Sequence, residues 1–193
     1  MEPHIAPINE FVATLQNLDG RGWLPSVAPL HGGSDAVILS VLRDPGPKTQ
    51  QGTGSGLLCI ENDDPTAEAQ CKLFDEYGIS PRWVLPWNAY PWYINRKPRA
   101  AEKDVGAQVL CDLIGLTRNL RVVLLQGNDA RDAWNRVAKL CPDLLETRML
   151  EVIESIHPGP QSLWTNDPVE RQARKDKQRR AFERMASVIQ DGT

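Results

Sequence analysis

Residues 36–46 read AVILSVLRDPG, a run of mainly aliphatic side chains that ends in a polar turn with proline and glycine. Gly33 precedes this run, and the turn Asp44-Pro45-Gly46-Pro47 closes it. A short apolar run bounded in this way is typical of a strand buried inside a sheet. We therefore expect a strand over residues 36–42 that ends in a sharp turn.

Similar runs occur twice further along the chain. Residues 84–88, VLPWN, are the weaker of the two because Pro86 cannot donate a hydrogen bond to a neighbouring strand. Residues 122–125, VVLL, end cleanly at Gln126-Gly127. This alternation of strands and helices favours a parallel sheet with helices on both faces, whose ligands bind beyond the carboxyl ends of the strands. The predicted helices cover residues 5–15, 68–77, 105–116 and 129–140.

The composition is that of an ordinary globular chain. With 193 residues, of which 41% are hydrophobic and 24% charged, it predicts a single domain. We also expect a monomer. We divide it into an N-terminal helix and loop (1–33), a motif-bearing core (36–165) and a basic C-terminal helix (169–190). The chain has no apolar run of ~18 residues and its start lacks a signal-peptide pattern, so we expect a cytoplasmic protein without a membrane partner.

The cysteines give no sign of a zinc site, since no C-x-x-C pair is present. Free cysteine is among the most buried residue types, so we expect four buried thiols. We expect neither a metal nor another cofactor. The four positions are Cys59, Cys71, Cys111 and Cys141.

Three polar side chains fall at the ends of predicted strands: Asp44, Asn88 and His157. Because the carboxyl ends of parallel strands share one edge, we expect the three to converge on one pocket. Together they offer a carboxylate, an amide with a donor and an acceptor, and a donor for developing negative charge. Each of them alone is an ordinary turn or structural residue.

The motifs around these residues, taken together, resemble the uracil-DNA glycosylase superfamily. Leu42-Arg43-Asp44-Pro45-Gly46 is similar to the first active-site motif of that family, and Leu85-Pro86-Trp87-Asn88-Ala89 is similar to its base-reading segment. His157-Pro158-Gly159-Pro160-Gln161-Ser162 resembles its final His-containing loop and is the most specific match. The motifs occur in family order within residues 36–185. The resemblance implies a central parallel four-stranded sheet flanked by helices in one domain.

The resemblance also implies a reaction, the hydrolysis of the N-glycosidic bond of a pyrimidine nucleotide flipped out of DNA. Asp44 would then stabilise an oxocarbenium-like sugar and orient the attacking water, and His157 would donate a hydrogen bond to the departing base. Asn88 would read the edge of the base. No lysine lies within the matched motifs, although Lys48 is close, so we expect a monofunctional enzyme without a lyase step. The cysteine spacing lacks the close pair of the branches that carry an iron–sulfur cluster, so we expect none here.

The chain departs from the family pattern on the base-binding side. Gly46 stands where the best-known branch has a tyrosine that blocks substituents at C5, so larger pyrimidines become plausible substrates. Ile60 aligns nearest to the phenylalanine that usually stacks on the base. Stacking would then be weaker or supplied by an aromatic residue near Asn88. The candidates are Trp87, which we include among the base-binding residues, Tyr90 and Trp92.

DNA contact is expected from the final loop and from two basic clusters, one over residues 96–103 and one with seven Arg and Lys residues over 170–184. Within the loop, either Gln161 or Leu163 could fill the gap left by a flipped base, with Gly159 and Ser162 beside them. The net charge of −3 argues against coating by nucleic acid over the whole surface but permits a local basic face. We expect single- or double-stranded DNA as the partner, bound through its phosphates. The basic residues that we select are Arg96, Lys97, Arg171, Arg174 and Lys175.

Three other interpretations remain open at this stage. One keeps the chemistry but assigns it to phage defence, through the excision of hypermodified cytosine or uracil from phage DNA. The second is a module that recognises flipped or damaged bases without cleaving them. The third is a hydrolase of free nucleosides built on a similar sheet.

Overall fold

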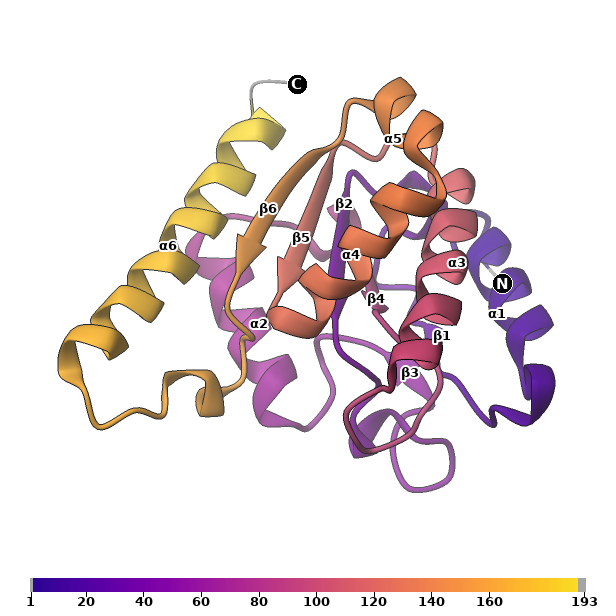
Figure 1. The fold of residues 1–193 in the computed structure, drawn as a ribbon, viewed down its shortest axis with the longest axis horizontal. Coiled ribbons are helices and arrows are strands. Elements are labelled where there is room, and N and C mark those ends of the chain that lie inside the picture. The colour runs from indigo at the N-terminus through magenta and orange to yellow at the C-terminus, as the bar shows by residue number, and fades with distance from the viewer. Residues whose placement is uncertain (1, 191–193) are drawn as a thin grey trace.

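The centre of the protein is a sheet of four parallel strands in the order β4-β2-β5-β6 (Figure 1). The computed structural model describes residues 2–190 and forms one α/β domain in which helices flank this sheet, which confirms the expected architecture. The strand expected over residues 36–42 begins two residues later than predicted. The strands are β2 (Ile38–Leu42), β4 (Val84–Asn88), β5 (Val122–Gln126) and β6 (Glu151–Ser155).

Helices cover both faces of the sheet (Figure 1). Side chains of α1 (Ala6–Leu15), α3 (Ala100–Leu116) and α4 (Asn128–Leu140) share one apolar cluster with one face of the strands. Side chains of α2 (Pro65–Glu76) and α6 (Pro168–Gln190) share a second cluster with the other face. The remaining elements are a two-stranded parallel ribbon of β1 (Ser26–Val27) and β3 (Leu57–Leu58), helix α5 (Pro142–Arg148), and the short helices η1 (Leu18–Gly20), η2 (Gly33–Asp35), η3 (Pro47–Thr49), η4 (Pro81–Trp83) and η5 (Pro160–Leu163).

The alternation of strand side chains decides which residues face the site. Leu39 and Val41 belong to the α1, α3 and α4 cluster, whereas Ile38 belongs to the α2 and α6 cluster. Since successive side chains of a strand point to opposite faces, Ser40 and Leu42 share the face of Ile38. Leu42 pairs with Asn88 on β4. On the other side of β2, Val41 pairs with Leu125 of β5, so Gln126 lies next to Leu42. The side chains of Asn88, Leu42 and Gln126 therefore lie in a row at the carboxyl end of the sheet, on the face that α2 and α6 cover.

The expectation of four buried thiols is wrong. Cys111 on α3 and Cys141, which follows α4, form a disulfide with their Cα atoms 6.4 Å apart. Cys59 and Cys71 are free but only partly buried. The pairing depends on the packing of α3 against α4, which the spacing of the cysteines could not reveal. In the part of the chain that the structure describes, no helix is long and apolar enough to cross a membrane.

Candidate functional site

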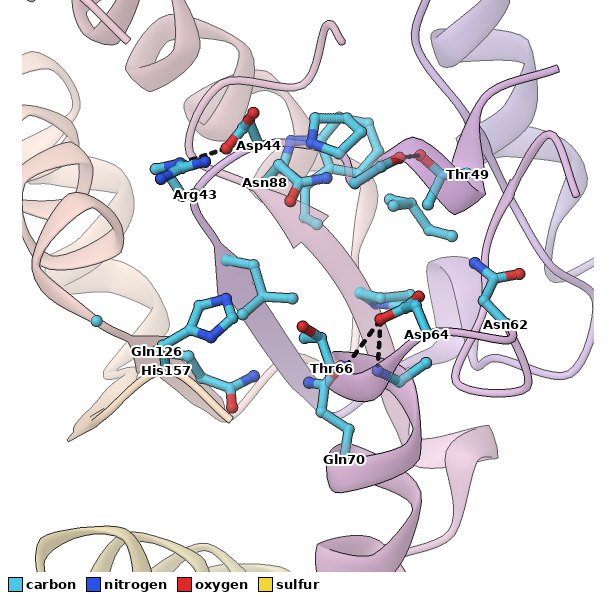
Figure 2. Close-up of a pocket in the computed structure, with 18 of the residues that line it drawn as sticks. Arg43, Asp44, Thr49, Asn62, Asp64, Thr66, Gln70, Asn88, Gln126 and His157 are labelled. Atoms are coloured by element: carbon cyan, nitrogen blue, oxygen red, sulfur yellow. Dashed lines mark hydrogen bonds and ion pairs between the residues drawn. The ribbon is translucent and has the colours of Figure 1, made fainter. Parts of the chain in front are cut away.

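A cavity of about 710 Å³ lies beyond the carboxyl ends of the strands. This volume falls within the range of about 300–1,000 Å³ that is usual for ligand pockets. Figure 2 shows the side chains around it, with Asp44 and Asn88 on one side and His157 and Gln126 on another. The three polar residues predicted from the strand ends thus border one cavity, and they come from β4 and from the segments that follow β2 and β6.

Asp44 lies in the turn after β2, and its carboxylate is almost entirely buried, with 4% of the side chain exposed. The turn is held against the end of β4, because Ala89 N–H donates to Leu42 O at 2.8 Å and Tyr90 N–H donates to Arg43 O at 3.0 Å. Burial raises the pKa of Asp44, and the hydrogen bond and charge of Arg43 oppose that rise. Asp44 is therefore a carboxylate whose ionised form depends on a cationic neighbour.

Asn88 is the last residue of β4 and is 2% exposed. Its Nδ2 atom is buried and has no hydrogen-bond partner within residues 2–190. A buried donor without a partner costs about 1–3 kcal/mol, so native proteins rarely retain one without a use for it. Because this amide borders the cavity, a ligand with an acceptor at that position would satisfy it.

His157 follows β6 and is held in one orientation by its own loop. Gly159 N–H donates to His157 Nδ1 at 3.0 Å, so in the neutral ring the proton is on Nε2. Burial lowers the pKa of His157, and the charge of Arg43 lowers it further. The imidazole is therefore neutral near pH 7 and carries an Nε2–H donor that no atom of its own loop occupies.

Gly159 is the residue that permits this orientation. A Cβ built on it would lie 3.0 Å from His157 Nδ1 and 2.8 Å from Gln161 Oε1. We expect Gly159→Ala to displace the imidazole and to lower the rate of the base excision expected from the sequence by about 10- to 100-fold, since a misplacement of about 1 Å can cost 10²-fold. Single-turnover kinetics measure the effect. Gly115→Ala is the matched control, because a Cβ there meets nothing within 4 Å, and a loss of activity as large in that control would contradict the argument.

Two of the predicted base-binding residues border the cavity as expected. Gly46 is exposed, and a Cβ built on it would meet nothing within 4 Å, so the cavity is open on that side. Ile60 is buried at 7% exposure and also lines the cavity. An aliphatic surface at this position packs against a flat ring but lacks the stacking area of phenylalanine.

The prediction that Trp87 contacts a base stays a prediction, and the packing of its indole does not favour it. Although Trp87 is among the residues that border the cavity, its indole packs in the α1, α3 and α4 cluster, where it stacks on Phe11 with ring centroids 6.5 Å apart. Asn88 faces the cavity, so its neighbour in the strand has to face the opposite side. Tyr90 and Trp92 are also buried, at 2% and 0% exposure, and contact each other in the same cluster.

The final loop lies partly in the cavity and is anchored to α6. Gln161 and Ser162 line the cavity, whereas Leu163 is half-buried outside its lining. Arg174 Nη1 donates to Ser162 O at 2.7 Å, and Arg171 Nη2 donates to Thr165 O at 2.5 Å. These two arginines, predicted to bind DNA, therefore hold the loop in place.

The remaining basic residues differ in their ion pairs and in the exposure of their side chains. Arg96 forms a two-pronged ion pair with Glu102 at 2.6 and 2.8 Å. Lys97 lines the cavity with 70% of its side chain exposed, and its Nζ lies 3.9 Å from Asp129 Oδ1. Lys175 is exposed on α6. Much of the expected basic face of α6 is neutralised, because Lys177, Arg179 and Arg184 pair with acidic residues of the protein.

The structure adds residues that the sequence analysis missed. Arg43 contacts Asp44 and influences His157, and Gln126 lines the cavity from the end of β5. Asp64 accepts hydrogen bonds from Thr66 N and Ala67 N, which fixes the start of α2 beside the cavity. The one available signal for Gln126 was its place directly before Gly127, at the end of a buried strand.

Within residues 2–190, no three His, Cys, Asp or Glu side chains are grouped closely enough to hold a metal ion. No protein-family model matches this chain, and a comparison with curated proteins finds no similar sequence.

Proposed function

We propose that this protein is a monofunctional DNA glycosylase that hydrolyses the N-glycosidic bond of a flipped-out pyrimidine and leaves an abasic site. The observation that carries the proposal is the convergence of a buried carboxylate, an unpartnered amide and an Nε2–H imidazole on one cavity. The three motifs that resemble the uracil-DNA glycosylase superfamily contribute one of these groups each. DNA as the substrate is in keeping with a cytoplasmic location.

The residues divide the reaction between its two charged fragments. As the bond between C1′ and the base nitrogen breaks, its electron pair leaves with the base and the sugar becomes oxocarbenium-like. Asp44 stabilises this cation and accepts a hydrogen bond from the water whose oxygen bonds to C1′. His157 Nε2–H donates to the pyrimidine O2, where negative charge develops. The water proton passes to Asp44 and then to solvent, and the base takes up a proton from solvent after it departs.

Asn88 supplies recognition in this scheme. Its buried Nδ2, which has no partner among the described residues, donates to a carbonyl of the base. A base inside a stacked duplex cannot reach a cavity at the end of the sheet, so the nucleotide has to leave the stack or come from a single strand. The loop around Gln161 and Ser162 borders the cavity and is placed to contact the strand on either side of the flipped nucleotide.

The test is alkali cleavage of labelled oligonucleotides that contain uracil, in parallel with genomic DNAs that carry 5-substituted pyrimidines. Cleavage at uracil supports the proposal. Binding to DNA without cleavage would support the recognition module instead, and hydrolysis of free deoxyuridine alone would support the nucleoside hydrolase.

A second candidate function follows from the open space at Gly46. Room on that side suits a pyrimidine with a bulky C5 substituent, as in hypermodified phage DNA. Cleavage of such DNA with no cleavage at uracil would support an anti-phage glycosylase. Full activity on uracil DNA with none on modified phage DNA would rule it out.

The neighbouring cation predicts a change in pH dependence. Arg43 lowers the pKa of Asp44 against the effect of burial, so Arg43→Gln should raise that pKa. Since the reaction needs the ionised carboxylate, the acidic limb of the kcat/KM profile should move to higher pH in the variant. Arg180→Gln, a change at an exposed arginine of α6, serves as the control. An acidic limb at the same pH in Arg43→Gln and the unmodified protein would contradict this role.

A further inference from the structure

Ser40, Gln70 and Gln126 form a buried polar cluster next to the residues that the proposed mechanism uses. Gln126 on β5 is 2% exposed, and its Nε2 donates to Ser40 Oγ at 2.8 Å. Gln70 on α2 also donates to Ser40 Oγ, at 3.5 Å. Because both amide nitrogens contact the same hydroxyl, the amide oxygen of Gln126 is turned away from it.

That oxygen is one of four buried polar atoms without a partner among the described residues that line the cavity; the others are Asn88 Nδ2, Trp87 Nε1 and Ser162 Oγ. Gln126 Oε1 is buried and has no hydrogen-bond partner within residues 2–190, and Gln126 lines the cavity. Of the two that belong to amides, Asn88 Nδ2 is a donor, whereas Gln126 Oε1 is an acceptor. The cavity therefore has a buried donor and a buried acceptor that no described atom of the protein satisfies.

The register of the sheet places these two amides on either side of Leu42. Leu42 pairs with Asn88, and Val41 pairs with Leu125, so Gln126 is next to Leu42 on the opposite side. Neighbouring strands lie about 4.8 Å apart, so the backbones of β4 and β5 are about 10 Å apart across β2. The hydrogen bond to Ser40 turns the head group of Gln126 toward β2, the strand that lies between the two amides. A flat ring resting on Leu42 would meet both amides at its edge.

We propose that Gln126 is a second base-reading residue, which accepts a hydrogen bond from a ring N–H while Asn88 Nδ2 donates to the adjacent carbonyl. This inference rests on the proposed function and names the substrate edge that the site prefers. A carbonyl next to an N–H is the edge of uracil-type bases. Cytosine instead presents an exocyclic amine next to an unprotonated ring nitrogen, so it would place acceptor against acceptor at Gln126 and donor against donor at Asn88. A site with buried polar groups discriminates strongly against a ligand that leaves them unpaired.

The melting temperature of a variant distinguishes a binding role of Gln126 from a structural one. Gln126→Leu keeps a side chain of similar size and removes the unpaired oxygen, whose burial is itself unfavourable. Ser40 would keep Gln70 as a neighbour. We therefore expect the variant to melt at the same temperature or higher, which is the signature of a residue retained for binding.

The experiment measures binding to single-stranded oligonucleotides that carry either 2′-deoxy-2′-fluorouridine or 2′-deoxy-2′-fluorocytidine, which resist cleavage of the glycosidic bond. The unmodified protein should bind the uridine oligonucleotide more tightly, and Gln126→Leu should reduce that preference by about 10-fold, within the range expected for an unpaired buried group. Gln108→Leu, the same change at an exposed glutamine of α3, should leave both the preference and the melting temperature unchanged.

Three results would overturn the inference: an unmodified protein with no preference, a preference that survives Gln126→Leu, or an equal loss of both affinities together with a lower melting temperature. Failure of the proposed function looks different. In that case ordinary uracil DNA would not be cleaved, while the binding preference and its loss in Gln126→Leu would remain.

Discussion

Asp44→Asn is expected to lower the rate of base excision by about 10²- to 10⁴-fold, the usual contribution of a positioned acid or base. The amide has nearly the same shape as the carboxylate, but it has no charge with which to stabilise the sugar cation and is a poorer acceptor for the attacking water. Single-turnover kinetics on uracil DNA, or on modified DNA if that is the substrate, report the loss in the chemical step.

The same substitution should leave the fold intact. Burial raises the pKa of Asp44, so the folded protein holds the proton more tightly than the unfolded chain does. For such a carboxyl group, ionisation reduces stability as the pH rises above the pKa of the unfolded chain. The neutral amide of Asp44→Asn avoids that loss, so we expect the melting temperature at pH 7 to be equal or higher in the variant.

The control for this prediction is Asp75→Asn, which makes the same change at an exposed residue of α2. DNA affinity should be similar in the unmodified protein and in both variants, because the carboxylate of Asp44 faces the sugar and not the phosphates. Excision by Asp44→Asn at the rate of the unmodified protein would refute the proposed mechanism.

The sheet and the site edge were predictable because their signals are local. Runs of aliphatic residues that end in Pro- and Gly-containing turns located β2, β4 and β5, and parallel strands bring such ends to one edge. Asp44 and Asn88 could be selected because each stands at the end of such a run, whereas His157 was selected with the Pro158-Gly159-Pro160 turn that follows it, and β6 ends just before it. The helix over residues 129–140 was likewise visible from its periodicity, and α4 begins at Asn128.

Properties that depend on packing between distant segments were not visible in the sequence. Trp87 was chosen for its proximity to Asn88 in sequence, but the alternation of strand side chains turns its indole to the opposite face. The basic residues of α6 were counted as free charge, whereas the partners of Lys177 and Arg184 are Glu154 and Glu151 on β6. Such ion pairs appear only once the helix is placed against the sheet.

Gln126 illustrates a different limit. Its position at the end of a strand was visible, but a glutamine there is unremarkable in a sequence. Its interest comes from a buried oxygen without a partner, which depends on where Ser40 and Gln70 lie. Only the three-dimensional arrangement shows that one half of this amide is occupied and the other half is not.

His157→Leu is the second variant with a large expected effect, a decrease of about 10²- to 10³-fold in the rate of excision, as for removal of one donor to a developing anion. Leucine fills a similar volume but cannot donate to the departing base. His157→Asn, which retains an N–H donor on a shorter side chain, should recover part of the lost rate. The comparison is made by single-turnover kinetics at pH 7 with protein in excess over DNA. A rate for His157→Leu close to that of the unmodified protein would contradict the assigned role.

The pH profile tests which form of the imidazole acts. Burial and Arg43 lower the pKa of His157 below its ordinary value of 6.5, so the ring loses its charge as the pH rises through that lower value. If the neutral ring is the donor, excision should stay constant from pH 7 upward until another group titrates. If the imidazolium were required, excision would decrease as the pH rises through the pKa of His157, opposite in direction to the Asp44 limb. A bell-shaped profile in which the rate falls before pH 7 would therefore favour the charged ring. A neutral donor requires a profile with a single acidic limb, and that limb should be absent in Asp44→Asn.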